Sequence, residues 1–176
     1  MKRTILVFGL ISGGLVGLFL AFAIIINFKG GAWFGYTTMV IALSLIYVGV
    51  RNFRDKFNNG VITFGKALKI AMGITLIAST IYVLVWLVEY YFFIPDFMDK
   101  YAAALDKEAR ASGLSPAALQ KKLDYIESMR IAYRNPIMVV LYTYLEIVPV
   151  GIIISLLTSL LLKRKRPPSP VAPTIA

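Results

Sequence analysis

Four long apolar stretches set the limits of what this chain can fold into. They cover about residues 5–26, 33–50, 66–93 and 137–162. An α-helix rises ~1.5 Å per residue and the hydrocarbon core of a bilayer is ~30 Å thick, so each stretch is about long enough to cross a membrane. Hydrophobic residues make up 59% of the chain, more than a soluble domain of this size can bury. The sequence therefore predicts an all-α integral membrane protein built as a four-helix bundle.

The one sizeable polar segment, residues 96–135, separates the third and fourth stretches. Ser112 and Gly113 are typical of a break between helices, while Ser115 and Pro116 are typical of an N-cap and a first helical residue. Apolar side chains recur at helical spacing on both sides of the break, at Phe97, Tyr101, Leu105, Leu119, Leu123, Ile126 and Tyr133. We therefore expect an extracytoplasmic amphipathic helical hairpin, whose apolar faces pack on each other or lie on the membrane surface.

The remaining segments complete the predicted organisation. Ile24, Ile25 and Ile26 continue the first stretch past the possible cleavage site at Ala21 and Ala23, so the run is too long for the apolar region of a signal peptide and predicts an uncleaved anchor. The polar run from Arg51 to Thr63, which contains Asn58-Asn59-Gly60, predicts a loop. We treat residues 1–166 as one membrane domain and residues 167–176, which include four prolines, as a disordered tail.

The distribution of basic residues predicts how the chain is oriented. With the N-terminus inside, the cytoplasmic segments carry eleven lysines and arginines close to the membrane, and the outer segments carry eight over a longer stretch. Cytoplasmic loops of membrane proteins are enriched in these residues. The pattern favours a bacterial inner-membrane protein with both termini in the cytoplasm. The formal charge of +10 therefore reflects membrane orientation, and we expect no nucleic-acid partner.

Two residue types are missing altogether. The chain has no cysteine and no histidine, which excludes disulfides, thiolate nucleophiles, Cys/His metal sites and histidine acid-base catalysis. It also lacks a Walker motif, a G-x-S-x-G elbow and a carboxylate cluster with metal-ligand spacing. We therefore expect a protein that is not an enzyme, with no catalytic residues, no bound metal and no cofactor.

Small residues form stripes along three of the four spans. Lipid tails are as apolar as leucine, so membrane helices associate through close backbone approach and interhelical hydrogen bonds. The stripes comprise Gly9, Gly13, Gly17 and Ala21 in the first span, Ala67, Ala71, Thr75 and Ser79 in the third, and Gly151, Ser155 and Ser159 in the fourth. They predict packing within one bundle or, alternatively, an oligomerisation face on the first span.

Glu89 and Glu146 are the ionisable residues that lie within the spans away from their ends. A carboxylate at the bilayer centre costs ~2.5 kcal/mol or more, so such a group is neutral, paired or in contact with water. Glu89 falls near a face that points into the bundle, Asn27 could meet it, and Glu146 is expected to bond to Tyr142, Tyr144 or a backbone carbonyl. These groups are either structural acids or a proton- or cation-accepting site made of Glu89, Glu146 and Asn27.

A basic cluster precedes the third span. Arg51, Arg54 and Lys56 lie beside the membrane and could contact anionic lipid headgroups. The same charges are explained by topology alone, because every multispanning protein needs such a cytoplasmic loop.

The segment from Met39 to Ala71 reads MVIALSLIYVGVRNFRDKFNNGVITFGKALKIA. With the acidic and aromatic end of the third span around Glu89, it resembles the bacterial membrane family designated domain of unknown function 4199. The resemblance covers most of the chain and implies four spans with a longer polar region before the last. The family brings no assigned activity.

Two functions remain open from the sequence. The first is a non-catalytic accessory or envelope protein that binds a protein partner through residues 96–135 and otherwise contacts the lipid bilayer. The second is a small proton- or cation-coupled transporter that uses its intramembrane carboxylates, as a homo-oligomer because four spans are few for a transport path.

Overall fold

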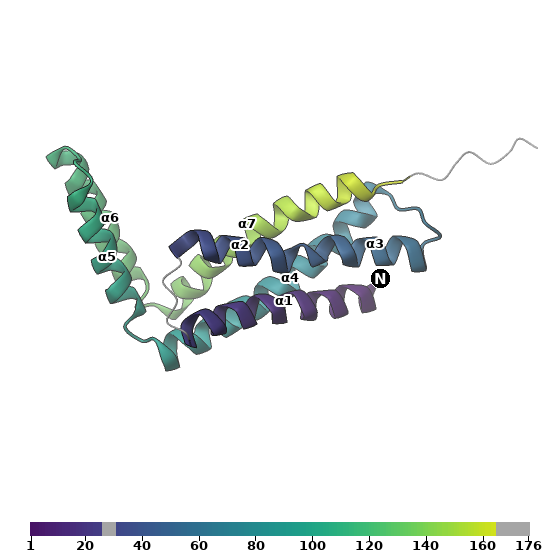
Figure 1. Cartoon of the computed structure of the whole chain (residues 1–176), viewed down its shortest axis with the longest axis horizontal. Helices are drawn as coiled ribbons and strands as arrows, with labels where there is room; N and C mark the ends of the chain where they lie inside the picture. Colours follow the sequence, from purple (N-terminus) through teal and green to yellow (C-terminus); the bar gives the residue numbers. More distant parts are fainter. Residues whose placement is uncertain (26–30, 165–176) are drawn as a thin grey trace, which may run out of the picture.

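The computed structural model describes residues 1–25 and 31–164, which are almost entirely helical (Figure 1). Four segments are long and apolar enough to cross a membrane: Lys2–Ala23, Trp33–Phe57, Phe64–Phe93 and Pro136–Leu162. The predicted all-α four-span bundle is thereby confirmed. The helices are α1 (Lys2–Ile25), α2 (Gly31–Leu43), α3 (Leu45–Phe57), α4 (Phe64–Val88), α5 (Phe97–Ala111), α6 (Pro116–Ala132) and α7 (Pro136–Leu162), with the π-helical turn η1 (Glu89–Phe93) between α4 and α5. Asn27 and the predicted disordered tail lie outside the described residues.

The second span consists of α2 and α3, joined at Ser44. The Ser44 N–H donates to the Val40 carbonyl at 2.9 Å, and the Tyr47 N–H donates to the Ser44 carbonyl at 3.0 Å, so the chain continues in the same direction through a tight turn. The helix runs on to Phe57, so the prediction of a loop from Arg51 onward is wrong for its first half. Arg51 to Phe57 contains no glycine or proline, and Arg51 pairs with Asp55 one turn later at 3.6 Å.

The loop therefore begins at Asn58. Asn59 and Gly60 adopt left-handed backbone angles, with φ of 53° and 72°. Such a conformation ends a helix. The next helix begins at once, because the Thr63 hydroxyl accepts the Lys66 N–H at 3.3 Å as an N-cap.

Helix α4 is the centre of the bundle and packs against α1 on one side and α7 on the other. The glycines of α1 make this close approach feasible: a Cβ added to Gly9 would lie 2.7 Å from Ile77 Cβ, and one added to Gly13 would lie 2.9 Å from Ile81 Cβ. The glycine face of α1 is therefore used for packing inside the chain, which is the first of the two interpretations of this stripe.

Hydrogen bonds between helices reinforce this packing. The buried Ser12 hydroxyl donates to the Ala42 carbonyl at 2.6 Å, which joins α1 to α2. Thr75 and Ser155 share a hydroxyl hydrogen bond of 2.9 Å between α4 and α7. In lipid such bonds satisfy polar groups that have no water to bind.

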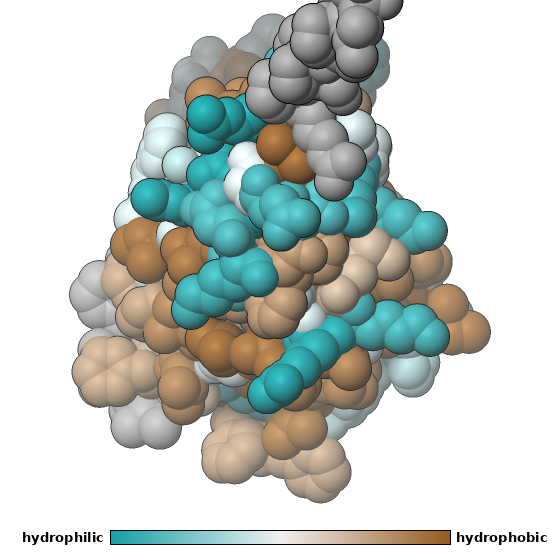
Figure 2. All heavy atoms as spheres, turned by 90° about the vertical axis from the view of Figure 1, so that its right-hand side faces the viewer, coloured by the Kyte–Doolittle hydropathy of each residue, from teal (hydrophilic) through white to brown (hydrophobic). Residues whose placement is uncertain are grey.

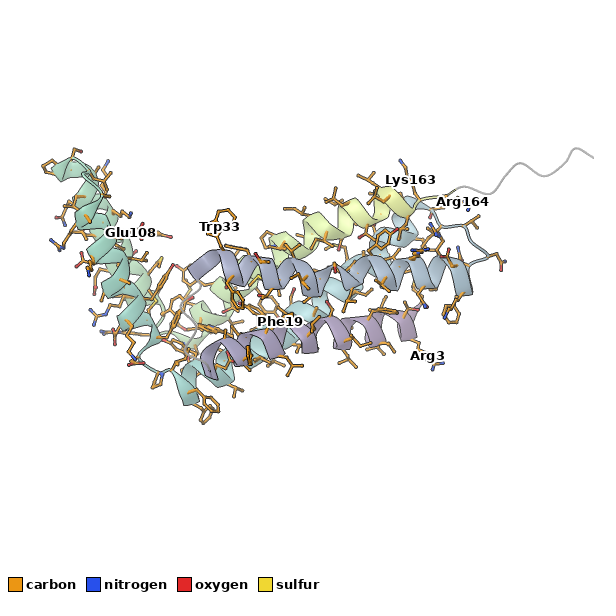
Figure 3. The ribbon with its side chains drawn as sticks, in the orientation of Figure 1. Arg3, Phe19, Trp33, Glu108, Lys163 and Arg164 are labelled. Atoms are coloured by element: carbon orange, nitrogen blue, oxygen red, sulfur yellow. The ribbon has the colours of Figure 1, made fainter. Side chains whose placement is uncertain are left out.

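Helices α5 and α6 form the predicted hairpin, which projects from one end of the bundle (Figure 1). Ser115 caps α6 by accepting the Ala118 N–H at 3.4 Å, and Pro116 is the first helical residue. Gly113, with φ of 66°, makes the turn before it. Glu108 lies on the hairpin, and Arg3, Lys163 and Arg164 lie at the opposite end of the molecule (Figure 3). We call the end with Glu108 the hairpin end and the end with Arg3, Lys163 and Arg164 the N-terminal end.

Aromatic contacts attach the hairpin to the bundle. Trp86 of α4 meets Phe97 of α5 edge to face, with ring centroids 4.9 Å apart. Tyr90 of η1 meets Tyr133, just after α6, at 5.9 Å. Tyr133 in turn stacks on Tyr142 of α7 at 5.6 Å. A separate small core at the hairpin end consists of Trp86, Tyr90, Phe97 and Tyr133, together with Met98, Ala102 and Ile126.

Candidate functional site: carboxyls, hairpin groove and basic end

Glu89 is a buried carboxyl at the point where α4 passes into η1. Its side chain is 5% exposed, and neither carboxyl oxygen has a hydrogen-bond partner among the described residues. The Ile94 N–H donates to the Glu89 carbonyl at 2.9 Å, five residues back, which defines the π turn. Single π turns are frequent at functional sites. The prediction that Glu89 points into the bundle agrees with this burial.

Glu146 lies on an exposed part of α7, about 15 Å along the helix from its start at Pro136. The Tyr82 hydroxyl donates to its Oε2 in a long hydrogen bond of 3.5 Å. The expectation of a partner at Tyr142 or Tyr144 is wrong: Tyr142 stacks on Tyr133, and the Tyr144 hydroxyl bonds to that of Thr80 at 3.0 Å. Tyr82 reaches Glu146 because α4 and α7 lie side by side at this depth.

Tyr82 is buried and bonds to one of the two carboxyls. Its hydroxyl donates to Glu146, and no hydrogen bond joins it to Glu89 among the described residues. Counted from Phe64, Tyr82 lies about 27 Å and Glu89 about 37 Å along the third span. Because Glu146 bonds to Tyr82, the carboxyls of Glu146 and Glu89 differ in depth by about 10 Å. Asn27, the third predicted member of this site, lies outside the described residues.

Hydroxyl groups continue the polar face of α4 toward the N-terminal end. Ser79 is fully buried, and its Oγ has no partner in the described part of the chain. Thr75 and Ser155 follow one turn further on. The described residues contain no group of three or more carboxylates, histidines or cysteines that could hold a metal ion. The proton- or cation-accepting site predicted from Glu89, Glu146 and Asn27 stays a prediction.

The hairpin carries a groove of about 520 Å³ between α5 and α6. Its lining includes Ala102 and Ala103, and its charged members are Asp99, Asp106, Asp124, Glu127, Arg110 and Arg130. Both arginines are paired, Arg110 with Asp106 at 2.9 Å and Arg130 with Asp99 at 2.7 Å. Four carboxylates face two guanidinium groups, so the groove has a net negative charge.

Ion pairs and burial shift two ionisation equilibria in the hairpin. The hydrogen bond from Lys100, 2.6 Å from Asp96, holds the pKa of that carboxyl below its ordinary value. Burial raises the pKa of Tyr133 to about 12. Tyr133 is therefore neutral at the base of the hairpin.

The predicted lipid-contact residues lie at the N-terminal end of the bundle. Arg54 and Arg51 both pair with Asp55, at 2.6 and 3.6 Å, which leaves Lys56 as the member without an ion pair among the described residues. Their contact with anionic lipid stays a prediction.

The sequence did not identify Tyr82 as the partner of Glu146, and it did not identify the hairpin groove. Tyr82 lies seven residues before Glu89 and so on the same face of α4, a signal that was available. The groove depends on how two helices face each other across a turn, which no single helical pattern specifies.

The fold and these groups define the chain as a multispanning helical membrane protein with an amphipathic hairpin at one end. The family model described as Protein of unknown function (DUF4199) matches residues 7–164, and the chain belongs to this family. The searches of curated proteins and of solved structures found no match.

Proposed function

We propose that this protein is a non-catalytic accessory or envelope component of a bacterial inner membrane, which uses its hairpin to bind a partner outside the cytoplasm. The main support for this proposal is the groove between α5 and α6, on a hairpin that projects from the bundle (Figure 1). Its net negative charge favours a partner segment with lysine or arginine side chains. The small residues Ala102 and Ala103 would allow that segment to approach closely.

The test is a crosslinking comparison in native membranes. A photoactivated crosslinker is placed at Ala103, in the groove, and a matched one at Glu108, which is exposed outside it. We expect one protein to be trapped from position 103 and not from position 108, and to copurify stoichiometrically with the tagged chain in mild detergent. A partner-free particle with no product at position 103 would contradict the proposal.

A charge variant makes the same test specific. Asp106→Asn together with Asp124→Asn removes two of the four carboxylates of the groove, and we expect the partner to be lost. Glu108→Gln is the control and should retain it.

A second function, a small proton-coupled transporter, is supported by the buried carboxyl of Glu89. A carboxylate within a span is costly unless it is neutralised, and intramembrane acids commonly mark proton or ion paths. Tyr82 and Glu146 would continue such a path, and a homo-oligomer would supply the spans that one chain lacks. The test is proton uptake into proteoliposomes: Glu89→Gln and Glu146→Gln should abolish it and Glu108→Gln should not. Proton uptake at the wild-type rate in all three variants would exclude this function.

A further inference from the structure

A cavity of about 470 Å³ opens at the N-terminal end, between the loop from α3 to α4 and the end of α7. Hydrophilic side chains gather on this end of the molecule, with hydrophobic ones around them (Figure 2). The cavity is lined by Phe57, Asn58, Asn59, Val61, Ile62, Thr63, Lys66 and Arg164. It therefore lies where two spans end, at the level where a membrane meets water.

Hydrogen bonds within the chain hold the cavity in shape. Ile62 and Arg164 exchange two backbone hydrogen bonds, of 3.0 and 2.8 Å, in an isolated antiparallel bridge. The Lys66 ammonium donates to Asn58 Oδ1 at 2.7 Å and lies 5.2 Å from the centre of the Phe53 ring. The Asn58 side-chain amide donates to the Val61 carbonyl. The loop is thus fixed to α7 and α4 by its own hydrogen bonds.

The charge of this cavity is positive and uncompensated. Lys66 and Arg164 contribute to its lining, no carboxylate does, and neither residue forms an ion pair among the described residues. Asp55, the described acidic residue at this end, is already shared by Arg51 and Arg54. The basic residues around the start of the third span therefore differ: Arg51 and Arg54 share one carboxylate, and Lys66 faces a cavity.

We propose that this cavity binds a phosphate group, with Lys66 and Arg164 as its cationic contacts. Both side chains donate charge-assisted hydrogen bonds to phosphate oxygens. Phe57, at the rim, is 64% exposed and lies where the glycerol or acyl part of a membrane lipid would pass. A lipid headgroup and free phosphate share this chemistry, and the experiment separates them. The proposal does not depend on the function of the hairpin or of Glu89.

The experiment counts phosphatidylglycerol molecules retained by the full-length protein, by native mass spectrometry from nanodiscs of phosphatidylglycerol and phosphatidylcholine. The variants are Lys66→Gln and Arg164→Gln, with Arg3→Gln as a control that removes the same charge at the same end outside the cavity. We expect about tenfold weaker retention of phosphatidylglycerol in each cavity variant, as for one lost charge-assisted hydrogen bond. The control should retain the lipid as the wild type does. The Arg164 side chain takes no part in the backbone bridge, so this variant keeps the loop in place.

Titration of the lipid-free protein with inorganic phosphate identifies the source. Phosphate binding that is lost in both cavity variants would assign the site to a free anion, and retention of phosphatidylglycerol alone would assign it to a lipid. An equal effect of Arg3→Gln and Lys66→Gln, or no effect of any variant, would overturn the proposal, because binding would then be diffuse or absent.

Discussion

Gly151 lies at a close approach of α7 to α4. A Cβ at this position would lie 3.3 Å from Thr75 Cβ and would overlap its Cγ2. The same threonine bonds to Ser155 and, at 3.4 Å, to the Gly151 carbonyl, so it cannot move without losing these contacts. The small-residue spacing predicted this contact face, because only small side chains let membrane helices approach closely.

Replacing Gly151 with valine should therefore destabilise the bundle. We expect a loss of about 1–3 kcal/mol in the free energy of unfolding, the usual cost of overpacking a core. Thermal unfolding in detergent measures the effect as a lower Tm. Gly14→Val is the matched control, since nothing lies within 4 Å of a Cβ built on Gly14. An equal fall in Tm in both variants would show that helix propensity, rather than the Thr75 contact, limits stability.

Tyr133 provides a pH-dependent prediction. Burial raises its pKa to about 12, against about 10 in an unfolded chain. The folded state favours the neutral phenol, so this contribution to stability is fully present below about pH 10 and is lost as the pH rises toward 12. Tyrosinate absorbance, followed in the wild type and in Tyr133→Phe, should differ by one group that ionises near pH 12. A difference that appears near pH 10 would place Tyr133 in water.

The attachment of the hairpin to the bundle depends on a few aromatic contacts. Phe97 meets Trp86 edge to face and stacks on Tyr101 with ring centroids 5.7 Å apart. An aromatic pair contributes about 1 kcal/mol beyond its buried area. Phe97→Ala should therefore increase hydrogen exchange of the α5 backbone about fivefold or more while the exchange of α4 is unchanged. Tyr125→Ala, which alters a side chain that is 62% exposed, should change neither. Faster exchange throughout α4 would show that the hairpin and the bundle unfold together.

The positions of the helices were predictable because apolar length and turn chemistry determine them locally. Ser115, Pro116 and Gly113 have their predicted roles, and the fourth predicted span, 137–162, corresponds to α7 (Pro136–Leu162). The end of the second span was not predictable from hydropathy, because charged side chains continue a helix beyond its apolar part. The partner of Glu146 was missed for another reason: Tyr82 is 64 residues away, and its contact depends on how α4 and α7 align.

Charged side chains lie at both ends of the molecule. Arg3, Lys163 and Arg164 lie at one end, and the hairpin with Glu108 lies at the other (Figure 3). An even number of spans places both termini on one side, and the enrichment of lysine and arginine near the membrane favours the cytoplasm for that side. The hairpin would then be outside, which the proposed partner binding requires.

The absence of cysteine from the sequence makes this orientation directly measurable, because one introduced thiol is the only reactive one in the chain. Lys56→Cys marks the N-terminal end and Glu108→Cys marks the hairpin; both positions are exposed and neither residue forms an ion pair within the described residues. A membrane-impermeant maleimide should label Glu108→Cys in intact cells and Lys56→Cys only after permeabilisation. The reverse pattern would place the hairpin in the cytoplasm, where the groove of α5 and α6 would meet a cytoplasmic partner and the phosphate cavity would face the outer leaflet.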